Sequence, residues 1–125
     1  MRRFALPLAA FVLLVASCGG HDQPGRTVTA PPGGALQVVA KEYSFDPSTI
    51  VLSGPGTLRV TVRNEGSLAH NLKVMRNGRE IGGTPSFPSG ESRSARLQLD
   101  SGSYEYICTV GDHAELGMRG TLKVD

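Results

Sequence analysis

The sequence predicts an all-β fold, a sandwich of about seven to eight short strands, over residues 36–125. Three observations support this prediction. Short runs rich in β-branched and aromatic residues alternate with turn residues over the whole range, which is the pattern of strands separated by tight connections. No stretch keeps apolar residues at helical spacing for more than about two turns. The number of runs in about 90 residues is typical of two packed sheets.

The predicted strands lie between segments that break a β-ladder. In chain order they are Leu36–Tyr43, Thr49–Leu52, Leu58–Arg63, His70–Met75, Ser94–Leu99, Ser103–Cys108 and Thr121–Val124. The breaks are proline or glycine segments and tight-turn sequences: Asp46-Pro47, Gly54-Pro55-Gly56, Asn77-Gly78 and Asp100-Ser101-Gly102. The stretch 76–91 has two Pro and four Gly, and we expect it to hold a loop or a short extra strand.

Alternation along the strands predicts which side chains enter the core. Leu58, Val60 and Val62 would point to one face of their strand, because the residues between them are Arg and Thr. Leu97 and Leu99 repeat the pattern. The domain is short and has no Trp, so its core is small, and small domains often need a metal or a disulfide to stabilise them.

The N-terminus has the pattern of an export signal. Met1-Arg2-Arg3 is basic, and the largely apolar residues 4–16 follow it. The apolar part is about a dozen residues long, shorter than the roughly 20 that a membrane-spanning helix needs. Val15-Ala16-Ser17-Cys18 resembles a bacterial lipobox, which implies that residues 1–17 are a signal peptide and that Cys18 becomes the lipidated first residue. Secretion with an unmodified Cys18 is the alternative.

Residues 18–35 are predicted to form a flexible tether between Cys18 and the domain, because they are rich in Pro, Gly and polar residues without periodicity. His21 is interpreted as a solvated residue of this spacer. Removal of the signal would eliminate Arg2 and Arg3, which leaves Lys and Arg equal in number to the 11 Asp and Glu. A net charge near zero indicates neither nucleic-acid binding nor a strongly charged docking face.

The candidate functional residues gather near the C-terminus, where Cys108, His113 and Met118 are separated by four residues each. If Cys18 is lipidated, Cys108 has no disulfide partner. An unpaired cysteine in an exported domain is an inert core residue, a nucleophile or redox sensor, or a metal ligand. The spacing favours a metal ligand, because one loop after a strand can bring all three side chains to one point. His70 is the other histidine of the domain.

This set of donor atoms predicts one copper ion in a blue, or type 1, site. Two imidazoles, one thiolate and a distant thioether suit both Cu(I), which prefers soft sulfur, and Cu(II), which prefers nitrogen. A site that keeps one geometry in both oxidation states needs little rearrangement when an electron arrives or leaves. We expect His70, Cys108 and His113 to be the strong ligands and Met118 the weaker, axial one.

Three segments also carry a family resemblance. They are residues 42–52 (Glu-Tyr-Ser-Phe-Asp-Pro-Ser-Thr-Ile-Val-Leu), the pair His70-Asn71, and Tyr106-Ile-Cys-Thr with His113 and residues 117–122 (Gly-Met-Arg-Gly-Thr-Leu). They resemble the cupredoxins, most of all the small bacterial blue copper proteins of the plastocyanin, azurin and pseudoazurin type, over nearly all of residues 36–125. The resemblance implies a Greek-key β-sandwich with copper at one end. It places the metal ligands at His70, Cys108, His113 and Met118, and it makes Asn71 a brace between the ligand loops.

Other residues around this site have expected roles. The amides near Asn71 and Thr109 are candidates to donate hydrogen bonds to the Cys108 thiolate. By family likeness, His113 is expected at the exposed rim of the site. The chain departs from several relatives at Gly111-Asp112, where they have proline before the last histidine. The Asp112 carboxylate would stabilise Cu(II) and raise the pKa of the neighbouring imidazole.

The sequence therefore predicts a monomeric electron-transfer protein, anchored by lipid to the cell membrane on its periplasmic or extracytoplasmic side. Its partners would be redox proteins of the envelope. An enzyme is not expected, because catalytic copper centres of the oxidase type need more histidines, or a second cysteine, than residues 36–125 contain. A copper carrier or chaperone is the main alternative, although such proteins are often Met-rich and this domain has only Met75 and Met118. A metal-free adhesive sandwich is the third class.

Overall fold

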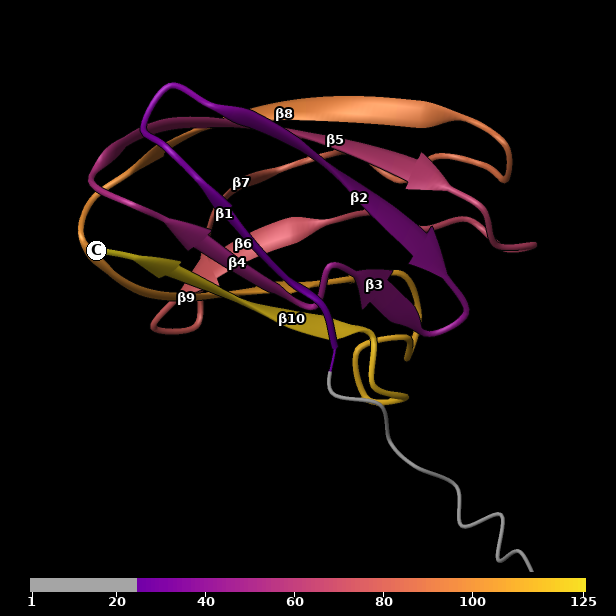
Figure 1. The fold of residues 1–125 in the computed structure, drawn as a ribbon. Helices are drawn as coiled ribbons and strands as arrows, with labels where there is room; N and C mark the ends of the chain where they lie inside the picture. The colour runs from indigo at the N-terminus through magenta and orange to yellow at the C-terminus, as the bar shows by residue number, and fades with distance from the viewer. Residues whose placement is uncertain (1–24) are drawn as a thin grey trace, which may run out of the picture.

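Ten β-strands and no helix make up residues 25–125, the part of the chain that the computed structural model describes. The strands are β1 (Thr27–Ala30), β2 (Ala35–Lys41), β3 (Ser44–Asp46), β4 (Thr49–Leu52), β5 (Gly56–Asn64), β6 (Lys73–Arg76), β7 (Arg79–Gly83), β8 (Ser92–Leu99), β9 (Gly102–Ile107) and β10 (Arg119–Val124). They form two sheets that pack as a sandwich (Figure 1). The predicted all-β sandwich is confirmed. The predicted signal peptide, Cys18 and His21 lie outside the described residues.

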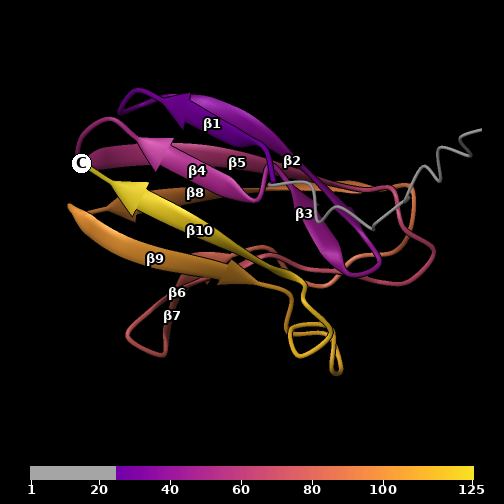
Figure 2. The ribbon, with the colours of Figure 1, turned by 60° about the horizontal axis from the view of Figure 1, so that its bottom comes forward.

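Both sheets are mixed. The larger sheet has the strand order β1-β4-β10-β9-β6-β7, and the smaller sheet has the order β3-β2-β5-β8. β4 runs parallel to β1 and β10, and β2 runs parallel to β5, whereas the other neighbouring strands are antiparallel. The chain therefore crosses repeatedly between the two layers (Figure 2). This topology brings the start of the domain, β1, into the same sheet as its last strand.

All seven predicted strands are present, with ends that differ by at most three residues from the prediction. The predicted number of seven to eight strands is too low, because β1, β3 and β7 are added. β7 lies in the stretch 76–91 that was expected to hold a loop or a short strand. β6 begins at Lys73 rather than at His70, because His70 leaves the ladder and forms an isolated bridge with Phe87.

The prediction of a flexible tether over residues 18–35 is wrong for its second half. Thr27–Ala30 form β1, which pairs with β4. The turn after β1 is fixed by a hydrogen bond from the Gly33 N–H to the Thr57 carbonyl (2.7 Å). β1 is an edge strand of four residues with only Ala30 buried, so it lacks the apolar alternation that identifies a strand in a sequence. Tertiary pairing, rather than local propensity, orders this segment.

The core lies between the inner faces of the two sheets. The apolar residues that were predicted to alternate inward are all buried: Leu58, Val60, Val62, Leu97 and Leu99. Cys108 and Met118 belong to the same buried cluster, so the candidate site is an extension of the core at one end of the sandwich. Over residues 25–125 we find no helix that is long and apolar enough to cross a membrane.

Tyr106 fixes the end of β9, from which the chain leads to Cys108. Its hydroxyl donates a hydrogen bond to the Pro47 carbonyl (2.6 Å), and burial of the ring raises the pKa of the phenol. Tyr106 lies opposite Gly120 of β10. A Cβ at Gly120 would lie 2.1 Å from the Tyr106 ring, so the ring can lie over β10 only because that residue is glycine. The strand that leads to Cys108 is therefore held by Pro47 and by β10.

Candidate metal centre

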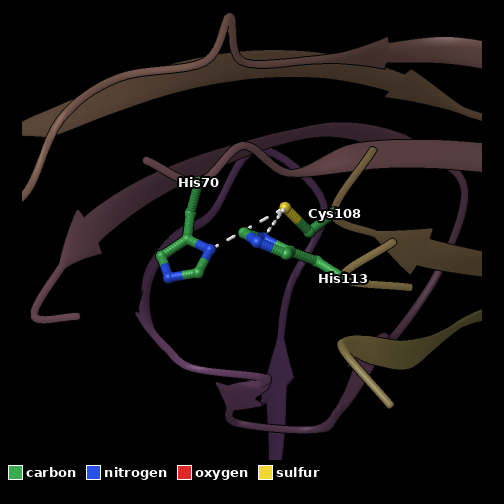
Figure 3. A group of neighbouring side chains, drawn as sticks. All are labelled: His70, Cys108 and His113. Carbon is green, nitrogen blue, oxygen red and sulfur yellow. Dashed lines mark hydrogen bonds between the residues drawn. The ribbon is translucent and has the colours of Figure 1, made fainter. Parts of the chain in front are cut away.

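Three of the predicted ligands meet at one end of the sandwich. Ligand atoms of His70, Cys108 and His113 all lie within 4.8 Å of one another. The Sγ atom of Cys108 is 3.9 Å from Nδ1 of His70 and 3.5 Å from Nδ1 of His113. The three side chains point toward one another (Figure 3), His70 from one segment and Cys108 and His113 from the loop between β9 and β10. Two imidazole nitrogens and one sulfur therefore face a common point.

This point is shielded from water. His70 and Cys108 are 0% exposed, and His113 is 6% exposed. The expectation that His113 is exposed at the rim of the site is therefore wrong, because the residue is buried. Tyr43 covers it, with the two ring centroids 5.0 Å apart. His113 is nevertheless the most exposed of the three candidate ligands.

The ligand loop, residues 108–118, supplies two of the three ligands and closes on itself. Cys108, a free cysteine, follows the end of β9 directly. Its N–H donates to the carbonyl of Met118 (3.2 Å), and the Met118 N–H donates to the carbonyl of His113 (3.0 Å). Met118 is 0% exposed and lies in the same buried cluster as Cys108. The predicted axial ligand is thus enclosed at the end of the loop, beside the residue that begins it.

His70 is held from the other side, by the end of β5 and the loop that follows it. Its main chain exchanges two hydrogen bonds with Phe87, of 3.2 and 3.0 Å. The buried Asn64 side chain donates to the carbonyls of Leu68 (2.8 Å) and Phe87 (3.2 Å) and accepts from the Gly66 N–H (2.9 Å). Asn64 was not predicted from the sequence, because neither its burial nor its Phe87 partner, 23 residues away, shows in the sequence.

Asn71 and Thr109 connect the two sides of the site. Asn71 Nδ2 donates to Thr109 Oγ1, and the Thr109 N–H donates to Asn71 Oδ1, each at 2.8 Å. These bonds join the segment that carries His70 to the start of the ligand loop, which is the bracing that the family resemblance implies. A hydrogen bond from an amide near these residues to the Cys108 thiolate stays a prediction.

Glu42 adds a carboxylate to the site that was not predicted from the sequence. Its Oε1 atom accepts hydrogen bonds from the N–H groups of Ser67 (2.8 Å) and Leu68 (2.7 Å) and lies 3.1 Å from Nε2 of His70. The bond from Leu68 contributes most to lowering the pKa of the Glu42 carboxyl to about 2. Burial lowers the pKa of His70, an effect that Glu42 opposes. The available signal was the position of Glu42 at the start of the family-like segment 42–52.

The departure from the family pattern at Gly111-Asp112 has a structural reason. Gly111 has a φ of 48°, which proline cannot adopt because its ring fixes φ near about −65°. Asp112 is exposed, and its carbonyl accepts a hydrogen bond from the Leu116 N–H (3.1 Å). The loop is therefore shaped by a glycine turn, and the Asp112 carboxylate faces solvent rather than a buried partner.

The donor atoms fit copper by their chemistry. Thiolate and thioether sulfur favour Cu(I), imidazole nitrogen suits copper in either oxidation state, and a trigonal His₂Cys set with a weak Met is the arrangement of blue copper sites. A structural zinc site has four strong ligands in a closed tetrahedron, whereas His70, Cys108 and His113 supply three. Within residues 25–125 they form the single group of three or more His, Cys, Asp and Glu donors close enough to share a metal ion.

A two-sheet sandwich with two histidines, a cysteine and a methionine at one end defines a small mononuclear copper protein. The family described as copper binding proteins of the plastocyanin/azurin type matches residues 34–125. The chain belongs to this family, and the cupredoxin fold and the copper cofactor predicted from the sequence are confirmed.

Individual relatives are distant. The copper-resistant cuproprotein CopI of Rubrivivax gelatinosus is 23% identical in an alignment 133 residues long, which covers 87% of this chain and 81% of the relative. Reduced auracyanin of Roseiflexus castenholzii has a TM-score of 0.69 at 18% identity, covering 77% of this chain and 99% of that chain. Rusticyanin of Thiobacillus ferrooxidans has a TM-score of 0.66 at 22% identity, covering 82% of this chain and 86% of that chain. The two solved structures establish the shared fold.

Proposed function

We propose that this protein is a monomeric type 1 copper electron-transfer protein that passes single electrons between redox proteins of the cell envelope. The observation that carries the proposal is the convergence of two imidazole Nδ1 atoms on a buried sulfur, at 3.9 and 3.5 Å. His70, Cys108 and His113 would hold the ion, with Met118 as its weak axial ligand. Copper bound there supplies a one-electron couple between Cu(I) and Cu(II).

The surrounding residues suit electron transfer because their hydrogen bonds bring the donor atoms together. The Asn71–Thr109 pair holds the two ligand-bearing segments together, and the backbone bonds of His70 to Phe87 fix the main chain that carries the His70 ring. Donors that are already in place move little between oxidation states, which keeps the reorganisation energy low. Burial also excludes water and competing ligands.

We propose that the copper end of the molecule is also where partners dock. His113 is the candidate ligand nearest to solvent, and two leucines in the neighbouring loops, Leu68 and Leu116, are 46% and 51% exposed. Exposed apolar side chains beside a short route to the metal suit brief contacts with donor and acceptor proteins. A net charge near zero after signal removal argues against docking by strong opposite charge.

We do not propose that this chain alone is an enzyme. A catalytic copper centre needs an open coordination position or a second metal. His70, Cys108 and His113 are buried, so a substrate has no direct access to the point that they face.

The test is the visible absorption spectrum of the purified protein after addition of one equivalent of Cu(II). We expect an intense thiolate-to-copper band that ascorbate bleaches and an oxidant restores. The band should vanish in Cys108→Ser, because serine has no thiolate, and it should persist in Cys18→Ala, which removes the other thiol. A wild-type protein that binds Cu(II) without this band would overturn the proposal.

Copper handling for resistance or delivery is a second candidate, favoured by the similarity to the copper-resistant cuproprotein CopI. A delivery protein must release its ion, whereas an electron carrier must keep it through many redox cycles. Two rates therefore separate the candidates: loss of Cu(I) to a high-affinity chelator such as bathocuproine, and oxidation of the Cu(I) form by ferricyanide. Oxidation much faster than copper loss supports electron transfer, and rapid copper loss supports delivery.

We also propose that Cys18 carries a lipid that holds the copper end close to the membrane. The chain enters the domain at that end, because Ser48 accepts a hydrogen bond from the Thr121 N–H (2.9 Å) and donates its own N–H to the Arg26 carbonyl (3.1 Å). Thr121 follows the ligand loop by three residues. Residues 19–24 are the whole connection from Cys18 to Gly25, a span of about 25 Å at most.

Cell fractionation tests the lipid anchor. The wild-type protein is expected in the membrane fraction, and Cys18→Ala is expected in the soluble fraction of the envelope because it cannot be acylated. The mass of the mature wild-type protein should exceed that of residues 18–125 by the lipid. Equal distribution of the two proteins, or an unmodified mass, would contradict the anchor.

A further inference from the structure

We propose that Glu42 is a positioning residue for copper, which holds His70 in the tautomer that leaves Nδ1 free for the metal and makes that imidazole a stronger donor to Cu(II). This inference rests on the proposed ligand set, but it concerns a residue outside that set. It also makes a prediction for the metal-free protein, so the two can fail separately.

The geometry assigns the proton on His70. Oε1 of Glu42 lies 3.1 Å from Nε2 of His70, and Nδ1 of the same ring faces Sγ of Cys108 at 3.9 Å. A neutral imidazole carries one N–H, and an ionised carboxylate can only accept a hydrogen bond. The proton therefore belongs on Nε2, and the lone pair on Nδ1 points into the site. A carboxylate behind a ligating histidine also raises the basicity of the donor nitrogen.

The carboxylate is itself held in place. Its Oε1 atom accepts hydrogen bonds from two successive main-chain N–H groups, those of Ser67 and Leu68, at 2.8 and 2.7 Å. The Glu42 side chain is 29% exposed, whereas the His70 side chain is fully buried. The loop thus presents a fixed negative charge at the edge of the site, on the side of the His70 ring opposite the thiolate.

Gly66 provides the space for this contact. A Cβ at Gly66 would lie 2.5 Å from Oε1 of Glu42 and 2.8 Å from Nε2 of His70. Both distances are shorter than any normal contact of a Cβ, so an alanine would displace the carboxylate, which ends a flexible side chain. Gly66→Ala therefore disturbs the Glu42–His70 contact without changing the charge of the protein.

A purely structural role is the competing explanation, because Glu42 also satisfies two N–H groups of the loop. That role predicts a less stable loop with no change in the electronic properties of the metal. A further alternative is that any negative charge near the site would shift the properties of the metal, without a hydrogen bond to His70. Glu65 serves as its control, since it carries the same charge next to Gly66 but pairs with Arg63 (3.3 Å) instead of His70.

The first experiment compares reduction potential and Cu(II) affinity in the wild type, Glu42→Gln, Glu65→Gln and Gly66→Ala. Glu42→Gln is expected to raise the potential and to weaken Cu(II) binding by about 10- to 100-fold, with a smaller loss for Cu(I). Gly66→Ala should shift both values in the same direction, and Glu65→Gln should match the wild type. A folded Glu42→Gln with wild-type values, or an equal shift in Glu65→Gln, would overturn the proposal.

The second experiment uses the metal-free protein and separates this inference from the proposed function. Nitrogen NMR of the histidine rings reports which ring nitrogen carries the proton. We expect His70 to be the Nε2–H tautomer in the wild type and to lose this preference in Glu42→Gln, because an amide can either accept or donate. An Nδ1–H tautomer in the wild type would overturn the role of Glu42, whatever the protein does with copper.

Discussion

The two sides of the metal site are built in different ways. The scaffold side consists of His70 and the residues that hold it, which are Glu42, Asn64 and Phe87. The contacts of His70 with Glu42 and Phe87, and that of Asn64 with Phe87, join segments that lie far apart in the sequence. They include the buried side chains of Asn64 and His70. The ligand loop, residues 108–118, is held mainly by short-range backbone bonds such as those from His113 to Val110 and from Gly117 to Ala114, each 3.1 Å.

This difference shows that the two sides of the site are stabilised by different kinds of contact. Long-range contacts fix His70 as part of the fold, so that ligand is in place whether or not a metal is bound. Short-range turns fix the shape of the ligand loop but tie it weakly to the rest of the protein. The Asn71–Thr109 pair is the side-chain link between the two regions. The metal would be the second link, and it should therefore stabilise the loop more than the scaffold.

Copper removal should have the largest effect and should reveal the two regions separately. At free copper about 1,000-fold above the Kd, binding adds about 4 kcal/mol to the free energy of unfolding. Urea unfolding of the Cu(I) and metal-free forms measures this difference. Amide exchange of both forms should then show faster exchange at His113 and Met118 without metal, with little change at His70 and Phe87. Equal changes in exchange rate on both sides would show that the metal stabilises the scaffold side as much as the ligand loop.

Asn64→Ala should be the most destabilising single change on the scaffold side. It removes three hydrogen bonds and leaves the buried Gly66 N–H without a partner, while the Phe87 carbonyl keeps only its bond from the His70 N–H; we expect a cost of about 2–4 kcal/mol. The measurement is urea unfolding of the metal-free protein. Ser94→Ala is the matched control, because it removes one exposed side-chain bond, to Thr61 (2.8 Å). A loss no larger than that of the control would show that the Asn64 network is not what fixes this side.

Asn71→Ala tests the link between the two regions. It removes both bonds to Thr109, so we expect a loss of about 1–2 kcal/mol in unfolding free energy together with weaker copper retention. Thr109→Ala is a graded comparison, since its main-chain N–H can still donate to Asn71 Oδ1, and its effect should be smaller. Titration with a chelator measures retention. If Asn71→Ala retains copper like the wild type and has the same potential, the link has no role in the site.

The fold was predictable where the determining pattern lies within one strand. Alternation in β5 identified the inward side chains, and all of those named from it are buried. Turn residues located the ends of the strands to within three positions. β1 and β3 have four and three residues, with one buried residue each. They form by pairing with β4 and β2, so they were not predicted. Short strands carry too few residues for a period to be visible.

The site was predictable to the extent that its chemistry is carried by rare residues. Two histidines and one cysteine in a small domain leave few alternatives, and the structure brings all three together. Glu42 and Asn64 were missed because their residue types are common and their role depends on distant partners. The burial of His113 was missed for the same reason, since the covering ring of Tyr43 comes from another segment.

Asp112→Asn should have the smallest effect. Asp112 is the carboxylate of the ligand loop that adjoins a ligand, so this variant can be compared with Glu42→Gln on the scaffold side. Asp112 is exposed, so its removal should change the unfolding free energy by less than about 0.5 kcal/mol. It should raise the reduction potential slightly, because a negative charge near the site favours Cu(II). Salt screens exposed charges strongly above about 0.1 M, so this shift should shrink in high salt. The shift in Glu42→Gln should persist, because it arises from a direct hydrogen bond to His70. Equal and salt-sensitive shifts in both variants would mean that the two carboxylates act only as distant charges. The difference between a fixed scaffold and a loosely tied loop would then have no effect on the reduction potential.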